Sequence, residues 1–319
     1  NAMVYILMFL YLYYGFFINL FKHNIYYEKN ITPIQNKWIG VLSKFLVTYV
    51  PLVPALILLW AIFSAQAGNG LHRLEIVDEI NSPVSIENYV HNFEAKTSLT
   101  DTVLPVYYLA SYGGGLRASA WTMLLLDKLN NDTTLHFMDH TLAMSGVSGG
   151  FIGLALYNAI YNENPSASDR TDRIKRIGQE NILAIELSYV MGYDLVREGI
   201  PFVPNLGPDR DRIAMNKYAS LVTADTLLLH ESYRKYWTSG YLRAHNRHLP
   251  VLIGNTTGTH GRHGIAFPLH VEKEQFDTIF PAAIDILSLP EKKSIRYLDA
   301  ASSTERFPVF SPAAEIESK

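Results

Sequence analysis

The sequence predicts an α/β fold with a mostly parallel central sheet, preceded by an N-terminal helical membrane region. Two long uncharged runs within the first 67 residues predict the helical region. Downstream, short apolar stretches rich in β-branched and aromatic residues alternate with helical patterns, and glycine-rich turns join two of these pairs. Repeated strand, turn and helix units are typical of layered α/β folds, in which the crossover helices make neighbouring strands parallel.

The two uncharged runs are long enough to cross a membrane. Residues 4–21 form a run of eighteen and residues 45–67 a run of twenty-three, whereas a helix needs about 20 residues to cross the hydrocarbon layer. The intervening loop contains four lysines, and Glu28 is its only acidic residue. The positive-inside rule therefore places this loop in the cytoplasm and the remainder on the opposite side. A signal peptide is the alternative for the first run, and a buried core helix for the second.

The composition changes near residue 70, after a Gly-Asn-Gly sequence at residues 68–70. We therefore expect an integral membrane anchor over residues 1–70 and a second domain over residues 71–319. The second domain contains four predicted strands and two predicted apolar helices, with a charged helix or loop that receives no functional role. The strands are expected at residues 103–110, 140–146, 249–257 and 296–300. The first apolar helix is expected after the glycines at 113–115 and up to residue 129, the second at 151–161, and the charged segment at 166–180.

Charge and cysteine content exclude several classes of function. A formal net charge of −3 and a pI near 6.4 give no basic excess, so nucleic acid is not an expected partner. The chain has no cysteine, which excludes disulfides and thiolate nucleophiles. The histidines show no metal-ligand spacing such as His-Glu-x-x-His. We therefore expect neither a metal nor a cofactor.

Ser148 stands in a Gly-x-Ser-x-Gly sequence, Gly146-Val147-Ser148-Gly149-Gly150. This motif forms a nucleophile elbow when it lies between a strand and a helix, as predicted here. The serine sits in a strained turn that exposes its hydroxyl, and side chains at the flanking positions would collide with neighbouring elements. The following helix directs backbone N–H groups and its positive dipole end at a developing oxyanion. Alone, five residues of this kind also fit an ordinary glycine-rich turn.

A second glycine-rich turn strengthens this interpretation. Gly113, Gly114 and Gly115 follow the strand predicted one unit upstream. Their backbone could supply the N–H donors of an oxyanion hole, which stabilises a transition state by about 3–4 kcal/mol. A phosphate-binding turn is the alternative, although no Gly-Lys-Ser/Thr follows as in a P-loop.

These two motifs resemble those of the patatin-like phospholipases, which carry a Gly-Gly-Gly-x-Arg-Gly oxyanion loop and a Gly-x-Ser-x-Gly elbow. The chain reads GGGLRA at residues 113–118 and GVSGG at residues 146–150, and the resemblance covers roughly residues 100–319. Softer matches are DRDR at 209–212, PVLIGNTT at 250–257 and SSTERFPVFSPAAEI at 302–316.

The resemblance implies a membrane-anchored serine hydrolase with a patatin-like layered fold, acting on lipid or other acyl esters. Ser148 would be the nucleophile, and Gly113, Gly114, Gly115 and Gly149 would form the oxyanion hole. Arg117 corresponds to the arginine of the oxyanion loop and would support the substrate or the loop. A surface arginine on the first helical turn is the alternative.

The sequence departs from the family at three points. Tyr112 and Ala118 replace residues of the oxyanion loop, and no Asp-Gly dipeptide occurs anywhere. In the family an Asp-Gly supplies the carboxylate that activates the serine. The resemblance places this carboxylate beyond Lys319, so we expect the hydrolase domain to lack its C-terminal segment. Asp285 and Asp299 are the downstream carboxylates to test, with surface or capping roles as the alternative.

Two other functions fit the same residues. Without its carboxylate, the chain would be a membrane-anchored pseudo-hydrolase that acts as a binding or scaffold module. A triad-type hydrolase would instead use a histidine as base. The candidates for that base are His230, His245, His248, His260, His263 and His270, of which we interpret His260 and His263 as loop residues.

Overall fold

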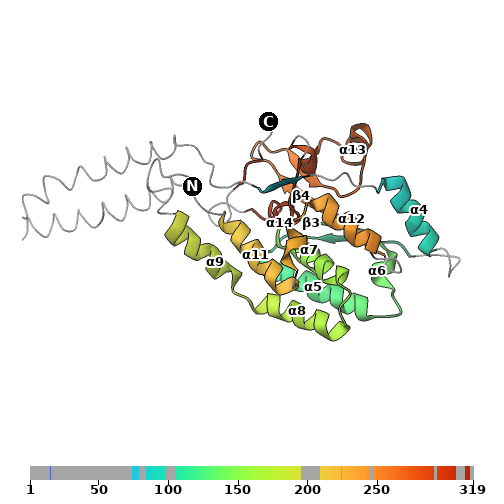
Figure 1. Cartoon of the computed structure of the whole chain (residues 1–319), viewed down its shortest axis with the longest axis horizontal. Coiled ribbons are helices and arrows are strands. Elements are labelled where there is room, and N and C mark those ends of the chain that lie inside the picture. Colours follow the sequence, from blue (N-terminus) through green and yellow to red (C-terminus); the bar gives the residue numbers. More distant parts are fainter. Residues whose placement is uncertain are drawn as a thin grey trace, which may run out of the picture. The chain divides into compact units, whose positions relative to one another are not determined.

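Figure 1 shows a computed structural model of the 319-residue chain. The structure describes residues 15, 74–78, 84–97, 105–194, 209–223, 225–243, 248–290, 293–306 and 313–316. The chain divides into two units, one of Asn1–Gly70 and Val190–Leu206, the other of Leu71–Tyr189 and Gly207–Lys319. The elements described below belong to the second unit, with one exception. The short π-helix η1 (Tyr189–Asp194) has its first residue in the second unit and its other residues in the first.

The predicted membrane-spanning runs at residues 4–21 and 45–67 lie outside the described residues, apart from Gly15. Within the described part of the chain, no helix has both the length and the apolar character needed to cross a bilayer. The membrane anchor and the domain boundary near residue 70 therefore stay predictions.

The second unit contains a five-stranded sheet in the order β2-β3-β4-β5-β6. Three of its four strand pairs are parallel, and only β4 and β5 pair antiparallel within this described sheet. The predicted α/β class with a mostly parallel sheet is therefore confirmed. A separate antiparallel pair consists of β1 and β7. The strands are β1 (Ile76–Asp78), β2 (Tyr107–Ser111), β3 (Thr141–Gly146), β4 (Val251–Thr257), β5 (His263–Ala266), β6 (Ile284–Asp285) and β7 (Lys293–Ile295).

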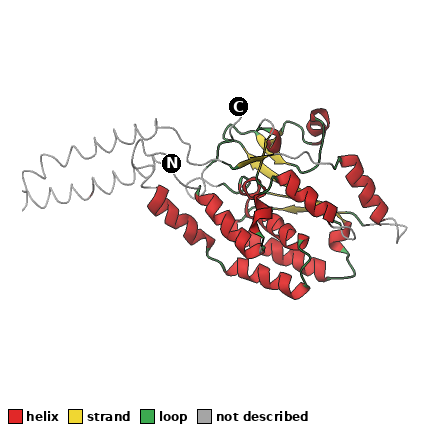
Figure 2. Cartoon of the chain, viewed as in Figure 1, coloured by secondary structure: helices red, strands yellow, loops and turns green. Residues whose placement is uncertain are grey.

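Helices surround the sheet, as Figure 2 shows in red. The α-helices are α4 (Ile86–Thr97), α5 (Gly115–Asn131), α6 (Phe137–His140), α7 (Ser148–Asn162), α8 (Ala167–Gln179), α9 (Ile182–Ser188), α11 (Arg210–Val222), α12 (Tyr233–Arg243), α13 (Lys273–Ile279) and α14 (Tyr297–Ser302). Two short 3₁₀ helices, η2 (Thr226–His230) and η3 (Ile286–Ser288), complete the described elements.

Helix α7 is the centre of the core. Every residue from Gly149 to Tyr161 is buried, as expected for a helix that is apolar on all sides. It packs against β2, β3 and β4 and against α5, α8, α11 and α14. Figure 1 shows α5, α8 and α11 grouped on the same side of the strands as α7. Because α7 starts directly after β3, its burial fixes the position of that turn.

Most predicted elements match the structure. Strands β2, β3 and β4 and helices α5 and α7 lie where the sequence places them, with ends shifted by a few residues. The charged segment at 166–180 is helix α8, but Arg170 on this helix is buried and pairs with Asp127 at 2.6 Å. The interpretation of this segment as a simply solvated face is therefore incomplete.

The predicted strand at residues 296–300 is wrong, because helix α14 begins at Tyr297. Arg296 is extended, with φ −57° and ψ 146°; it forms an isolated antiparallel bridge with Ser232 and is the N-terminal cap of this helix. All six residues of α14 are buried, so both faces of the segment are covered. Periodicity cannot distinguish a short buried strand from one buried helical turn.

His248 belongs to the core rather than to a catalytic triad. Its Nε2 lies 2.9 Å from the Tyr89 hydroxyl, and its ring makes an edge contact with Phe93 at 4.8 Å between centroids. Burial, with a smaller contribution from the Lys96 charge, lowers the pKa of His248 to about 4. The imidazole is therefore neutral in the native state at neutral pH.

Substitution of His248 by phenylalanine should make the stability of the protein less dependent on pH. The unfolded histidine takes up a proton near pH 6.5 and the native one only near pH 4. Native stability is therefore lost progressively as the pH falls through this window. We expect the melting temperature to fall less between pH 7 and pH 5 in His248→Phe than in the parent chain. His270→Phe, at an exposed site, is the control and should keep the parental slope. An equal slope in His248→Phe would contradict the assignment.

Candidate active site

Ser148 occupies a sharp turn between β3 and α7. Strand β3 ends at Gly146 and helix α7 begins at Ser148, so Val147 alone connects them. Val147 is extended, with φ −140° and ψ 146°, whereas Ser148 has a φ of +55°. A non-glycine residue in this region costs about 1–3 kcal/mol and persists only where surrounding contacts hold it. The serine therefore has the strained backbone expected of a nucleophile elbow.

The two glycine-rich turns are in direct contact. A Cβ built on Gly113 would lie 3.1 Å from the Cβ and 3.5 Å from the Oγ of Ser148. A Cβ on Gly149 would lie 2.0 Å from the carbonyl oxygen of Gly115, and one on Gly150 would lie 2.3 Å from that of Tyr112. The structure thus brings together all the glycines predicted for the oxyanion hole. It also explains the glycines after Ser148, because any side chain there would collide with backbone.

The turn from β2 into α5 depends on glycine for a different reason. Gly114, the cap of α5, has a φ of +154°, and Gly115 has a φ of +58°. Residues with side chains rarely adopt these conformations. Arg117 is the third residue of α5 and is exposed, which fits a surface residue of the first turn. Its part in substrate binding stays a prediction.

Hydrogen bonds from three segments hold the elbow. The Val147 N–H donates to the carbonyl of Ser111 on β2 at 3.2 Å, and the Ser148 N–H donates to the carbonyl of Thr304 at 2.9 Å. From β4, the Asn255 amide donates to the carbonyl of Gly146 at 2.9 Å and to the Ser145 hydroxyl at 2.8 Å. Sequence reasoning did not identify Asn255 or Thr304, although both lie in segments that resemble the family.

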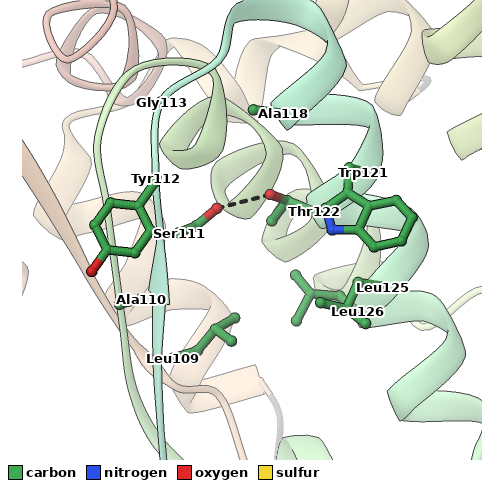
Figure 3. Close-up of a pocket in the computed structure, with 10 residues that line it drawn as sticks. All are labelled: Leu109, Ala110, Ser111, Tyr112, Gly113, Ala118, Trp121, Thr122, Leu125 and Leu126. Atoms are coloured by element: carbon green, nitrogen blue, oxygen red, sulfur yellow. Dashed lines mark hydrogen bonds between the residues drawn. The ribbon is translucent and has the colours of Figure 1, made fainter.

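An apolar cavity of about 310 Å³ lies between β2 and α5, next to this site. Leu109, Trp121, Leu125 and Leu126 supply apolar walls, and Gly113, which contacts Ser148, also lines the cavity. Figure 3 shows the Leu125 and Leu126 side chains across the cavity from Leu109, and the hydrogen bond between the Ser111 and Thr122 hydroxyls, 2.8 Å long. Because Gly113 borders both the cavity and the serine, an apolar chain in the cavity would begin close to Ser148.

The two candidate carboxylates have structural partners. Asp285 caps η3 by accepting the Leu287 N–H at 3.0 Å and pairs with Arg234 at 2.5 Å, which confirms the capping interpretation. Asp299 is buried rather than on the surface, and both of its oxygens accept hydrogen bonds from Arg296, at 2.9 and 3.1 Å. Burial raises the pKa of Asp299, and the Arg296 charge opposes this shift. Both carboxylates therefore form hydrogen bonds and ion pairs that stabilise the fold.

Of the six candidate histidines, His245 lies outside the described residues and the others lie in different parts of the fold. His230 lies 3.0 Å from Arg296, His270 is exposed near Glu272, and His260 lies in an exposed turn. His263 is the first residue of β5 rather than a loop residue, and its Nε2 lies 3.2 Å from Asn255 Oδ1. Through Asn255, His263 has an indirect connection to the elbow.

Among the residues that the structure describes, none forms a hydrogen bond with the Ser148 hydroxyl. These residues also contain no group of three histidine, aspartate or glutamate side chains that could hold a metal ion. The arrangement therefore presents a strained serine, two adjacent glycine turns and an apolar cavity, which together suit attack on an ester of an apolar acid.

The chain is similar to two solved structures of human GIVD cytosolic phospholipase A2. The first is a complex with methyl gamma-linolenyl fluorophosphonate. Its comparison with this chain gives a TM-score of 0.38 and 13% identity, and covers 72% of this chain. The second is a complex with this inhibitor and terbium chloride. Its comparison gives a TM-score of 0.37 and 14% identity, and covers 74% of this chain. The matches cover 36% and 37% of the phospholipase chains, so this chain spans little more than a third of their length. No family model and no curated protein matches the sequence.

Replacing Gly150 by alanine should disrupt the contact between the two turns. The added methyl group would lie 2.3 Å from the Tyr112 carbonyl oxygen, inside a buried helix that cannot move freely. Overpacking of this kind costs about 1–3 kcal/mol, and we expect urea unfolding to show a loss in that range. Gly178→Ala on α8 is the matched control, since its methyl group has only Ala120 as a neighbour, at 3.9 Å. That change should stabilise the protein by about 0.5–1 kcal/mol. Equal effects of the two substitutions would contradict the packing argument.

Proposed function

We propose that this chain is a serine acyl hydrolase of the patatin-like lipid hydrolase type. The observation that carries the proposal is the position of Ser148, in a strained turn with a φ of +55°, against the Gly113 backbone. Such strain is expected where a hydroxyl must be presented to a substrate. The sequence resemblance of the two glycine motifs supports the same reaction.

In the proposed reaction, the Ser148 oxygen attacks the ester carbonyl carbon and loses its proton to a base. Backbone N–H groups of Gly113, Gly114, Gly115 and Gly149 donate to the developing oxyanion. The alcohol takes up the proton and leaves, and water then cleaves the acyl-enzyme by the same steps in reverse order. The start of α7 at Ser148 adds a favourable dipole at this point.

We further propose that the substrate is a lipid or another ester of an apolar acid. The cavity beside Gly113 is lined by leucine side chains and Trp121. Each methylene group buried there contributes about 0.8 kcal/mol, so an acyl chain binds more tightly as it lengthens. The predicted N-terminal membrane helices would hold the site where such lipids are concentrated.

A fluorophosphonate probe tests the nucleophile. We expect covalent labelling of the 319-residue chain at one site, which intact-mass and peptide mass spectrometry assign to Ser148. Ser148→Ala should abolish the labelling. Ser220→Ala, at an exposed serine on α11, is the control and should still be labelled. Labelling that persists in a folded Ser148→Ala variant would refute the assignment.

The same experiment decides between this enzyme and a pseudo-hydrolase that binds without turnover. The observation that favours the second candidate is that none of the described residues hydrogen-bonds to the Ser148 hydroxyl. A folded chain that resists labelling would support the scaffold function. His263→Ala addresses the triad mechanism, since loss of labelling in that variant would make the histidine the base.

Shortening Trp121 should weaken the binding of long acyl chains. This ring lines the cavity and is exposed, so a bound chain would cover part of it. We expect Trp121→Ala to lower kcat/KM for an eight- to twelve-carbon p-nitrophenyl ester about tenfold, which corresponds to roughly 1.4 kcal/mol of lost contact. The acetate ester should be unaffected, because its acyl group ends near the serine. Leu242→Ala, an exposed apolar residue on α12, should change neither rate. Equal losses for both esters in Trp121→Ala would contradict an acyl-chain cavity.

A further inference from the structure

The segment after α14 reaches the elbow through its backbone. Its residues 303–306 follow the helix, and the Thr304 carbonyl accepts the Ser148 N–H at 2.9 Å. The neighbouring Ser303 carbonyl accepts a hydrogen bond from the Thr256 hydroxyl at 2.6 Å. This segment therefore touches both the serine itself and β4, the strand beside β3.

Arg306 fixes the far end of this segment by a buried ion pair. Its Nη2 lies 2.6 Å from an oxygen of Asp209 and 3.2 Å from an oxygen of Asp211, both at the start of α11. The side chains of Arg306, Asp209 and Asp211 are 6%, 2% and 0% exposed. Asp209 is also the N-terminal cap of α11. Removing one partner of a buried pair leaves an uncompensated charge, so such a contact is hard to break.

The surrounding charges favour this pairing. Burial alone would lower the pKa of Arg306, but the Asp211 and Asp209 carboxylates raise it above its ordinary value. Burial raises the pKa of the neighbouring Glu305, and the charges of Asp211 and Glu186 add to that shift. These effects favour the neutral form of Glu305.

We infer that Arg306 is a positioning residue for Ser148, because its ion pair with Asp209 and Asp211 fixes the segment whose Thr304 carbonyl holds the serine backbone. The functional consequence rests on the proposed hydrolase activity. The strained Ser148 backbone needs contacts that hold it from outside the turn. The Thr304 carbonyl supplies one such contact, and Arg306, 158 positions from Ser148 along the chain, fixes the segment that carries it. A displacement of about 1 Å at a reacting group can lower a rate roughly 100-fold.

The test compares Arg306→Ala and Asp209→Asn with Arg234→Ala in the full 319-residue chain. Asp209→Asn keeps a side-chain oxygen for capping α11 but removes the charge that pairs with Arg306. Arg234 is the matched control, since it also pairs with a capping aspartate, Asp285 at 2.5 Å, but at η3 beside β6. Arg306→Lys tests partial rescue, because an ammonium group keeps the positive charge but not the geometry by which Nη2 reaches both carboxylates.

Two measurements are made on each variant. Hydrogen exchange of peptides that contain Ser148 reports whether its N–H keeps the bond to Thr304, whether or not the chain is an enzyme. Fluorophosphonate labelling at several probe concentrations gives the maximal labelling rate and the probe affinity separately. A change in positioning lowers the maximal rate, whereas a general loss of folded protein lowers the labelled amount.

We expect Arg306→Ala and Asp209→Asn to speed exchange at Ser148 at least tenfold and to lower the maximal labelling rate by about 10- to 100-fold. Probe affinity should change less than threefold, Arg306→Lys should recover part of the rate, and Arg234→Ala should match the parent.

Parental exchange and labelling in a folded Arg306→Ala or Asp209→Asn variant would overturn the inference. Should Arg306→Ala fail to fold, Asp209→Asn and Arg306→Lys decide the question alone. A parent chain that is never labelled would contradict the hydrolase proposal, while the exchange data would still judge the role of Arg306.

Discussion

The site depends on one close approach of backbone to backbone, between the turn after β2 and the turn after β3. At Gly149 a Cβ would lie only 2.0 Å from the Gly115 carbonyl oxygen, so this approach is closed to every other residue. The parallel register places Ser111 beside Gly146, which brings the ends of the two strands level. Both crossover helices then start at the same edge of the sheet. The serine, the glycine turn and the two helix N-termini therefore share one location because of strand pairing and glycine, without a long connecting loop.

Burial of α7 turns this local contact into a rigid one. The helix is enclosed along Gly149–Tyr161 and packs on three strands, so its first turn has little freedom to shift. A strained residue at its start can then be maintained by the packing of the entire helix. The outer side of the same site is less enclosed, since Trp121 and Tyr112 are exposed at the cavity between β2 and α5. The structure thus combines a rigid inner wall at the serine with an open apolar side, an arrangement suited to a ligand with a reactive head and an apolar chain.

The sequence was sufficient for those parts of the site that depend on local rules. Strands β2 and β3, helices α5 and α7 and the position of Ser148 follow from apolar runs interrupted by glycine, and each signal spans only a few neighbouring residues. The strand predicted at residues 296–300 failed because a buried helical turn has the same apolar content. Thr304, Asn255 and Arg306 could not be assigned from the sequence, since their contacts with the elbow and with α11 join positions about 100 residues apart or more. Such contacts leave no periodic signal in the chain.

Three buried arginines in the second unit each pair with an aspartate. Arg296 pairs with Asp299, Arg306 with Asp209 and Arg170 with Asp127, and all six of these side chains are less than 10% exposed. The stability gained from such pairs is small, because removing two charges from water costs about as much as their attraction returns. These pairs have a more strongly defined direction, since a guanidinium group donates its hydrogen bonds in its own plane. Arg306 and Arg170 each join helices or segments that are distant in sequence, which apolar packing alone would leave free to slide. The geometry of the turn at Ser148 therefore rests on apolar burial for its stability and on paired charges for its register.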